Sequence, residues 1–397
     1  MMRRTGMRTA LAGLLSALLL AASGAAVSQP LADGVTAPAA SDTAMADYRR
    51  KLAEYTLARQ QYETEAEAYW SAIATKRRSR NAKRRNQAPI VLDDYVLTQP
   101  PRYSGPPKPI DPSAPAGPPP PPPRKYVPVV ADFLTSARQH FDFVPARPRN
   151  ELQFKRAYAR AAAQAGLTRE QIVRLYAFES GGNGKYDVQA GLEYSKNRRA
   201  ISTALGYNQL LHVNSLSLLA ENGDHLIKAL TAMAAGRSGE ARSALERKIA
   251  VIRRMVAFAR TVPVRWSEHE KLADTPQGLG PHALNLDIDV GPLLQTQKLV
   301  NSVIFARRKG FDRPLSAAEL EMMNFTGDGN GFDIVTMPTA MRGQVPTANF
   351  FRQSGYERNP VVIRNNTVAR LLAATDAAMD REIKRQGAKD MAAAYRR

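Results

Sequence analysis

The chain has 397 residues, with 56 Lys and Arg against 36 Asp and Glu, so its formal net charge is +20. It has no cysteine, which excludes a disulfide framework, a cysteine-ligated metal site and a cysteine nucleophile. A hydrophobic share of 44% with only 7% aromatic residues is enough for an ordinary core and favours helices over a β-sandwich. A charge of this size predicts an anionic partner or surface.

The N-terminus has the order of a secretory signal peptide, which we place at residues 1–28. Arg3, Arg4 and Arg8 precede the apolar run Leu11–Ala22, and small residues follow it. The run is too short to cross a bilayer core of about 30 Å at about 1.5 Å per residue, and an uncleaved N-terminal anchor is the alternative. We expect an exported, periplasmic protein whose mature part has no transmembrane segment. That location disfavours nucleic acid as the partner.

The next segment, residues 29–98, is predicted to be helical from Asp47 to Arg85. The small polar residues at 29–45 predict no regular structure. Tyrosines recur along the helix at spacings of three and four, and such a stripe packs on the chain itself or on a partner. Seven Lys and Arg fall within residues 76–85. Like charges this dense are expected to stay solvated, or to bind an anionic envelope polymer or a protein partner.

A proline-rich linker is expected at residues 99–126. It contains six consecutive prolines, Pro118–Pro123, which form a stiff, extended spacer without hydrogen bonds of its own. The short apolar stretch Ile90–Leu97 before it is expected to dock on the later domain. Residues 127–397 are predicted to form one mainly α-helical domain, long enough to bury a core. Its expected helices are Glu151–Ala165, Thr168–Ser180, Asn208–Glu221, His225–Ala235, Glu240–Thr261, Gly291–Lys309, Ser316–Met323 and Thr367–Gln386.

One of these helices carries a candidate catalytic group. A capping box at Thr168–Gln171 starts it, and an apolar stripe follows at Ile172, Leu175 and Tyr176. Glu179 lies on the same face, immediately before a Gly-rich stop. Burial and the negative end of the helix dipole both disfavour its ionised form, so we expect a raised pKa, as a general acid for a glycosidic oxygen needs. A buried ion pair with an Arg is the alternative.

Three short segments in order carry a family likeness. Glu179-Ser180 closes the helix, the segment Ala204–Leu210 reads Ala-Leu-Gly-Tyr-Asn-Gln-Leu, and Met323-Asn324 follows much later. This order resembles the lytic transglycosylases of the soluble, lysozyme-like type. In that family a Glu-Ser pair bears the only catalytic carboxylate, and a Ser-x-x-Gly-Ala-x-Gly-Leu-Met-Gln segment lines the sugar cleft.

The likeness spans about residues 150–335 and departs from the family at several positions. Ala204, Gly206 and Gln209 match the second element, with Tyr207 and Asn208 where the family has Leu and Met; Ala200 and Thr203 replace its Ser and first Gly. The third element in the family is a Tyr-Asn pair whose Tyr helps to hold the catalytic Glu. Here the Asn is present and a Met stands in place of the Tyr.

The resemblance implies cleavage of the β-1,4 bond between N-acetylmuramic acid and N-acetylglucosamine in peptidoglycan, with a 1,6-anhydro product. It implies that Glu179 acts as acid and then as base, and that no cofactor or metal is needed. The substrate-binding residues it implies are Ser180, Gly206, Tyr207, Asn208, Gln209 and Asn324. A non-catalytic envelope protein that binds peptidoglycan or organises partners is one alternative. A goose-lysozyme-like hydrolase is another, if Asp187 or Glu193 lies across the cleft.

Other motifs give weaker signals. The segment Thr326–Gly331 looks like part of a calcium loop, but it lacks an acid at the first ligand position and has Met337 at the twelfth. We interpret it as a glycine-rich turn that borders the cleft. The five histidines show no paired metal spacing, and no phosphate-binding loop is present.

Overall fold

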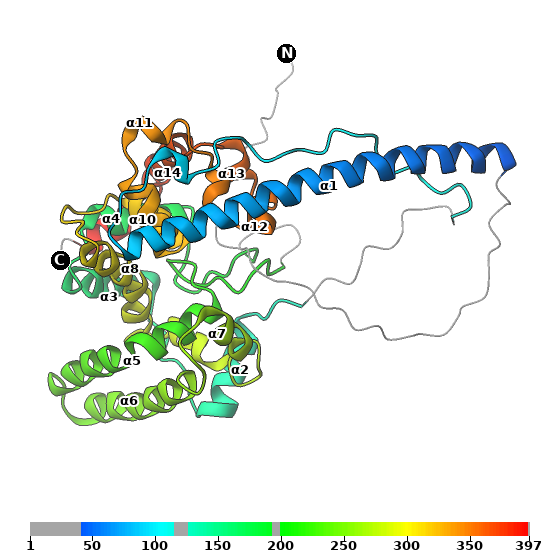
Figure 1. Cartoon of the computed structure of the whole chain (residues 1–397). Helices are drawn as coiled ribbons and strands as arrows, with labels where there is room; N and C mark the ends of the chain where they lie inside the picture. Colours follow the sequence, from blue (N-terminus) through cyan, green and yellow to red (C-terminus); the bar gives the residue numbers. More distant parts are fainter. Residues whose placement is uncertain (1–40, 115–125, 193–198, 396–397) are drawn as a thin grey trace, which may run out of the picture. The chain divides into compact units, whose positions relative to one another are not determined.

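The computed structural model describes residues 41–114, 126–192 and 199–395 (Figure 1). The predicted signal peptide and the six consecutive prolines lie outside the described residues. The described part is mainly α-helical, as predicted, and contains no β-strand. No helix in it combines the length and the apolar character needed to cross a membrane.

The α-helices are α1 (Asp42–Arg85), α2 (Val130–Phe141), α3 (Glu151–Gln164), α4 (Arg169–Glu179), α5 (His212–Ala235), α6 (Gly239–Ala259), α7 (Trp266–Ala273), α8 (Gly291–Arg308), α9 (Ala317–Thr326), α10 (Asp328–Thr336), α11 (Thr339–Arg342), α12 (Gln353–Glu357), α13 (Pro360–Arg364), α14 (Val368–Glu382) and α15 (Gln386–Ala394), with 3-10 turns η1 (Leu92–Asp94), η2 (Gly280–Leu286) and η3 (Thr347–Phe350).

The chain forms two compact units. The main unit consists of the described residues of 126–339 and 369–395, and the long-helix unit contains α1, the residues that follow it as far as Ala114, and Ala340–Val368. The segment Ala340–Val368, which the sequence placed in one domain with residues 127–397, therefore packs with α1.

In the long-helix unit, the chain folds back along α1. The ring of Tyr103 packs edge-on against the rings of Tyr55 and Tyr62, with centroids 6.1 and 5.6 Å apart. Gly105 passes so close to the helix that a Cβ there would lie 2.8 Å from Cβ of Ala58. The hydroxyl of Tyr69 donates to the carbonyl of Thr98 at 3.0 Å. The tyrosine stripe of α1 therefore packs on its own chain, and the start of the proline-rich segment covers it.

The helix α1 begins earlier than predicted. Its N-cap is Ser41, whose side chain accepts a hydrogen bond from the backbone N–H of Ala44 at 3.2 Å, and Asp42 adds a negative charge at the positive end of the helix dipole. The prediction of no regular structure over residues 29–45 is therefore wrong for Asp42 and the residues that follow it.

The main unit has two apolar clusters. One is formed by α2, α5, α6 and η2, and the other mainly by α3, α4, α9 and α15; α8 contributes to both. The helices α5 and α6 pack side by side (Figure 1). They approach closely because a Cβ on Gly223 of α5 would lie 2.4 Å from Cγ2 of Val256 on α6.

This close approach explains why one prediction of helix bounds was wrong. Two helices were predicted at Asn208–Glu221 and His225–Ala235, but α5 runs unbroken from His212 to Ala235. Helix packing over Gly223 outweighs the helix-breaking tendency of the Asn-Gly-Asp sequence. The residues before His212 form a tight turn instead.

A second correction concerns the segment Thr326–Gly331, which is not an extended glycine-rich turn. Gly327, with φ of 82°, separates α9 from α10, and the rest of the segment is helical. A Cβ on Gly331 would lie 2.3 Å from Cα of Met323, so the glycine lets α10 fold back onto α9. The helices α2, α7, α10–α13 and α15 were not predicted either; most of them are short and take their stability from packing rather than from local pattern.

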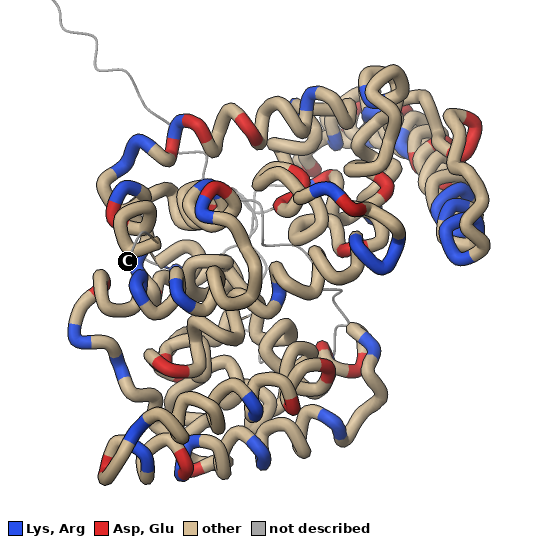
Figure 2. Tube along the Cα trace, turned by 90° about the vertical axis from the view of Figure 1, so that its left-hand side faces the viewer, with Lys and Arg blue, Asp and Glu red and all other residues tan. Residues whose placement is uncertain are grey.

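Basic and acidic positions are interspersed along the Cα trace in Figure 2. Several form ion pairs within the main unit. Arg174 of α4, for example, lies 2.6 Å from Oδ1 of Asp376 and 2.6 Å from Oδ1 of Asp380 on α14. These contacts connect α14 to α4, the helix that carries Glu179.

Candidate functional site

The helix α4 places Glu179 as the sequence predicts. The side chain of Thr168 accepts the backbone N–H of Gln171 at 3.1 Å, and the Gln171 side chain accepts the backbone N–H of Thr168 at 2.8 Å. The apolar stripe is buried, and Glu179 is the last helical residue, with 7% of its surface exposed. Gly181 and Gly182 then take positive φ values of 61° and 71° and stop the helix. Glu179 thus lies on the buried face of α4, at its negative end.

The helix α9 brings Asn324 to Glu179. Nδ2 of Asn324 donates a hydrogen bond to Oε1 of Glu179 at 3.0 Å. Met323, the residue in place of the family Tyr, is fully buried in the apolar cluster that also contains Phe178. The amide of Asn324 therefore holds Glu179, and Met323 packs in the core.

A second carboxyl group, missed by the sequence analysis, lies against the first. Glu321 is one turn before Asn324 on α9 and only 1% exposed. Burial raises its pKa well above the usual range, and the charge of Glu179 and a hydrogen bond shared with Glu179 raise it further. A hydrogen bond from Asn324 and the charge of Lys298 act in the opposite direction. Asn324 therefore contacts both carboxyl groups.

This pair has a definite chemical consequence. Oε2 of Glu321 is buried and receives no hydrogen bond from any donor group among the described residues. Two ionised carboxylates in contact would repel each other, so burial and the charge of Glu179 favour the protonated form of Glu321. Glu179 is the less deeply buried of the two groups. A protonated carboxyl group beside a second one that is less deeply buried is suited to acid–base chemistry.

The Glu321 signal was present in the sequence. The helix α9 is apolar on nearly all sides, and its residues from Ala317 to Met323 are buried. An acidic side chain in such a helix costs free energy unless it has a partner. Its spacing of three from Asn324 puts both on one face. That combination identifies a site candidate, although not its partner on α4.

The segment Ala204–Leu210 is a tight turn held by one side chain of α8. Leu205 and Leu210 exchange two backbone hydrogen bonds of 3.0 and 3.1 Å. Oε1 of Gln295 accepts the backbone N–H of Tyr207 at 2.9 Å. Gly206 has φ of 80°, and a Cβ there would lie 2.5 Å from Nε2 of Gln295. Glycine is required at this position both by the backbone conformation and by the approach of Gln295.

Tyr207 and Asn208 lie in the core beneath the turn. The Asn208 side chain accepts the hydroxyl of Tyr158 at 2.7 Å and donates to the carbonyl of Gln295 at 2.9 Å. The hydroxyl of Tyr207 donates to Glu151, and its ring packs edge-on against Tyr158 with centroids 5.3 Å apart. Both residues are at most 2% exposed, so they support the site from within and their polar groups are bound by the protein.

Tyr158 connects this turn to Glu179. Burial raises the pKa of the Tyr158 hydroxyl; its bond to Asn208 lowers it, and the charge of Glu179 raises it further. The hydroxyl therefore stays protonated near the carboxyl pair. A buried tyrosine of α3 therefore bonds to the turn and experiences the charge of Glu179, whereas the position beside Asn324 holds Met323.

The two remaining predicted residues make local contacts. The hydroxyl of Ser180 donates to the carbonyl of Tyr176 at 2.6 Å. The amide of Gln209 donates to the carbonyl of Gly206 at 2.8 Å, while its own backbone is left-handed with φ of 43°. Among the predicted site residues, the structure therefore pairs Glu179 with Asn324, and it places Gly206, Tyr207 and Asn208 together around Gln295.

The partners that the structure shows for Glu179 are the amide of Asn324 and the carboxyl group of Glu321. Asp187 lies 3.7 Å from Arg147 and is well exposed, and Glu193 is outside the described residues. No group of three metal-ligating side chains occurs in the part of the chain that the structure describes.

The basic residues at 76–85 differ from expectation. Arg80 is fully buried and donates to the carbonyls of Asp94 at 2.9 Å and Asn349 at 3.0 Å. Arg77 donates to the carbonyl of Phe351 at 2.6 Å, and burial lowers its pKa to about 10. The prediction that these charges stay solvated is therefore wrong for the arginines at the centre of the run. Their guanidinium groups hold the long-helix unit together, because a planar fork can satisfy several carbonyls at once.

The same contacts show where the apolar stretch after α1 docks. The side-chain amide of Asn349 accepts the backbone N–H of Val96 at 2.9 Å and donates to the Val96 carbonyl at 2.8 Å. The ring of Tyr95 packs at 5.9 Å from that of Phe350. The stretch Ile90–Leu97 therefore docks on η3 within the long-helix unit.

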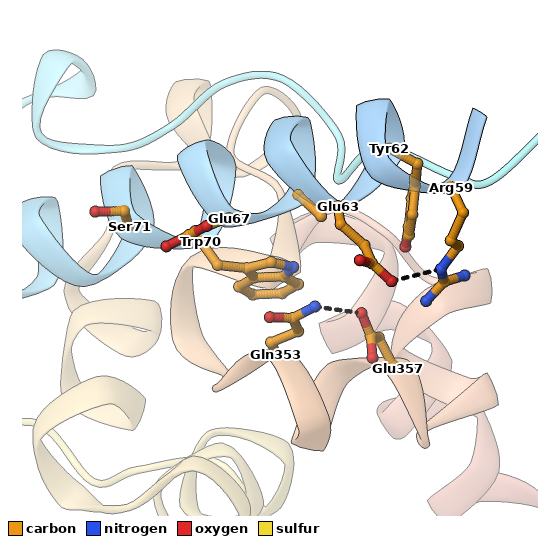
Figure 3. A pocket seen from close by; sticks show the side chains of 9 residues that line it. Arg59, Tyr62, Glu63, Glu67, Trp70, Ser71, Gln353 and Glu357 are labelled. Atoms are coloured by element: carbon orange, nitrogen blue, oxygen red, sulfur yellow. Dashed lines mark hydrogen bonds and ion pairs between the residues drawn. The ribbon is translucent and has the colours of Figure 1, made fainter. Parts of the chain in front are cut away.

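The long-helix unit also has an open hollow of about 660 Å³ between α1 and α12 (Figure 3). Its side chains are partly engaged with each other: Arg59 pairs with Glu63 at 2.7 Å, and Gln353 donates to Glu357 at 2.9 Å. Trp70 points from α1 toward Gln353 (Figure 3), and its ring centroid lies 5.7 Å from that of Tyr356. The acids that line it are at the surface, so it lacks a buried carboxyl pair like that of the main unit.

No family model, no curated protein and no solved structure matches this chain. The interpretation of the site therefore rests on its own geometry.

Proposed function

We propose that the main unit cleaves the β-1,4 bond between N-acetylmuramic acid and N-acetylglucosamine in peptidoglycan, as a lytic transglycosylase with a lysozyme-like helical fold. The observation that carries the proposal is Glu179 at the end of α4, held by Asn324 and beside the buried carboxyl group of Glu321. The proposed location is the periplasm, and the proposed partner is the glycan strand. The segment order Glu179-Ser180, Gly206–Gln209 and Asn324 supports this assignment.

In the proposed reaction, Glu179 first donates its proton to the glycosidic oxygen as the bond from C1 to that oxygen breaks. It then takes the proton of the C6 hydroxyl of the muramoyl residue as O6 forms the new bond to C1. The product is a 1,6-anhydro ring, the proton returns to the carboxyl group, and no water is consumed. Glu179 has this role rather than Glu321 because it is the more exposed of the two.

Glu321 is a positioning residue in this mechanism. Both carboxyl groups hold a proton when the substrate binds. When Glu179 has given its proton to the glycosidic oxygen, Glu321 keeps its own proton and donates a hydrogen bond to the resulting carboxylate. A charge-assisted bond of this kind stabilises the ionised intermediate. Asn324 adds a second donor to the same group, at 3.0 Å.

The contact between the two carboxyl groups favours the lyase over a hydrolase. Hydrolases of the retaining type place two carboxyl groups about 5–5.5 Å apart across the sugar, and inverting enzymes about 6.5–9.5 Å apart. Carboxyl groups that share a hydrogen bond are much closer, with oxygens about 2.5–2.7 Å apart. A carboxyl group this close to Glu179 does not meet the spacing that either kind of hydrolase needs, which supports the lyase.

A second candidate function is peptidoglycan binding without cleavage. The low exposure of Glu179 and the Met323 side chain in the core favour it. Binding to sacculi without release of soluble fragments is its signature.

Digestion of purified sacculi tests the proposal. Wild type should release muropeptides that end in anhydro sugars, which are one water lighter than hydrolysed ends by mass spectrometry. Glu179→Gln should release none, while Asp187→Asn, a matched change at an exposed acid, should behave as wild type. Equal release by Glu179→Gln and wild type would sink the assignment. Products with hydrolysed ends would show that the enzyme is a hydrolase and not a lyase.

A further inference from the structure

The main unit has a groove of about 510 Å³ formed by α5, α7, α8 and the start of α10. Its lining is mixed, with Trp266 from α7, asparagines from α5 and α8, and apolar side chains of α8 such as Ile304. Trp266 is 40% exposed, which is unusual for a side chain whose burial contributes so much free energy. The groove is therefore built around a large aromatic ring that is open to solvent.

Three groups on the groove have hydrogen-bonding capacity left over. The carboxylate of Glu221, the guanidinium of Arg308 and the indole N–H of Trp266 form no hydrogen bond or ion pair among the described residues. The amides beside them are already ordered, since Asn301 donates to Asn222 at 2.9 Å. In the groove, Glu221 can therefore accept hydrogen bonds, while Arg308 and the indole N–H of Trp266 can donate them.

The charges on the groove balance. Lys298 and Arg308 are countered by Glu221 and Asp328, and Nζ of Lys298 lies 3.9 Å from Oδ1 of Asp328. A polyanion would gain little from such a surface, although the whole chain is strongly basic. A ligand rich in hydroxyl and amide groups, with an apolar face for the indole, fits this set of groups.

Lys298 lies between the groove and the charge environment of Glu321. It lines the groove, and its positive charge also acts on Glu321, where it partly offsets the effects of burial and of Glu179 on the pKa. Asp328, the neighbouring acid, begins the helix that follows α9.

We propose that this groove binds an N-acetylated glycan chain, with one sugar ring stacked on Trp266 and its polar groups met by Glu221 and Arg308. The proposal rests on the proposed function for the identity of the natural ligand. Binding itself is independent of cleavage, and it is tested without turnover.

The two tryptophans of the chain allow a direct test. In a Glu179→Gln background, Trp70→Phe leaves Trp266 as the only indole, and Trp266→Phe leaves Trp70. The probe is the β-1,4-linked tetramer of N-acetylglucosamine. Titration should shift the emission of Trp266 to shorter wavelengths in a saturable manner, and should leave the emission of Trp70 unchanged. No shift at Trp266, or an equal shift at Trp70, would overturn the proposal.

Calorimetry provides a readout that does not depend on Trp70→Phe folding. Trp266→Ala in the Glu179→Gln background should bind the tetramer about tenfold more weakly, or worse, than Glu179→Gln alone. Equal affinity of the two proteins for the tetramer would show that the groove is not the binding site. If Glu179→Gln still cleaves sacculi, the proposed function fails while the titration still decides the groove. If cleavage depends on Glu179 but the emission of Trp266 does not shift with the tetramer, only the proposal that the groove binds a glycan fails.

Discussion

Nδ2 of Asn324 lies 3.0 Å from Oε1 of Glu179 and donates to it, across 145 positions of sequence. The same amide contacts Glu321, so one asparagine orders two carboxyl groups that would otherwise repel. This arrangement makes Asn324 the geometric centre of the candidate site.

Replacing Asn324 by Ala should lower the rate of muropeptide release by about 10²-fold, because a catalytic group displaced by about 1 Å loses a factor of that order. The measurement is the initial rate on purified sacculi, with circular dichroism to show that the fold persists. Asn330→Ala on α10 is the matched control, since its amide donates to the carbonyl of Thr326, and it should retain near wild-type activity. Equal rates for both variants would contradict a role for Asn324.

Replacing Glu321 by Gln should move the high-pH limb of the activity profile to lower pH. The Gln amide can donate to ionised Glu179 but cannot repel it or share a proton with it, so Glu179 loses its proton more readily. The measurement is kcat/KM against pH on soluble glycan strands, with Asp187→Asn as the control. A variant whose profile superimposes on that of wild type would show that the pair is not coupled in solution.

The same substitution should change how stability depends on pH. The pKa of Glu321 is raised in the folded state, so folding retains its proton more tightly than the unfolded chain does. The resulting stability is present below the ordinary Glu pKa near 4.5 and is lost as pH rises toward the folded pKa, at about 1.4 kcal/mol per pKa unit. Glu321→Gln should remove this loss and become more stable relative to wild type as pH increases.

Hydrogen exchange of peptides from α9, measured at pH 5, 7 and 9, can follow this effect within the main unit. A two-unit chain need not unfold in one step, so a local probe is preferable to a single melting temperature. A difference between variant and wild type that does not change with pH would contradict the raised pKa.

Replacing Gly206 by Ala should destabilise the main unit by about 1–3 kcal/mol more than Gly310→Ala does, because the new methyl group collides with Gln295. Both glycines have φ of 80°, but nothing lies within 4 Å of a Cβ at Gly310. The two variants therefore share the cost of the left-handed backbone and differ only in the collision. Hydrogen exchange of main-unit peptides at increasing urea concentration compares the two variants, and equal losses would remove the contact with Gln295 from the explanation.

Replacing Arg80 by Ala should loosen the long-helix unit. The carbonyls of Asp94 and Asn349 lose a buried donor, and each unpaired group costs about 1–3 kcal/mol. Hydrogen-exchange protection in the second half of α1 should decrease strongly, whereas Arg85→Ala, at an exposed position of the same helix, should leave it near wild type. If Arg80→Ala exchanges like Arg85→Ala, the basic run is only a surface feature.

The sequence alone determined the local part of the site. The capping box at Thr168, the apolar stripe of α4 and the glycine stop are short-range features, and helical spacing places Glu179 on the buried face whatever surrounds it. The tyrosine stripe of α1 was predicted to pack for the same reason. These features could be predicted from the sequence because the interactions that form them lie within one or two helical turns.

The partners that these residues contact are determined only by the tertiary structure. Nothing in the local sequence of α4 specifies Glu321, and the raised pKa depends on burial and charge supplied by α9. Likewise, the +20 charge of the chain suggested a solvated basic run, but Arg80 became a buried donor when η3 covered it. Burial and electrostatics depend on groups that are distant in sequence and adjacent in space, so the spacing of residues gives their face on a helix but not their partners.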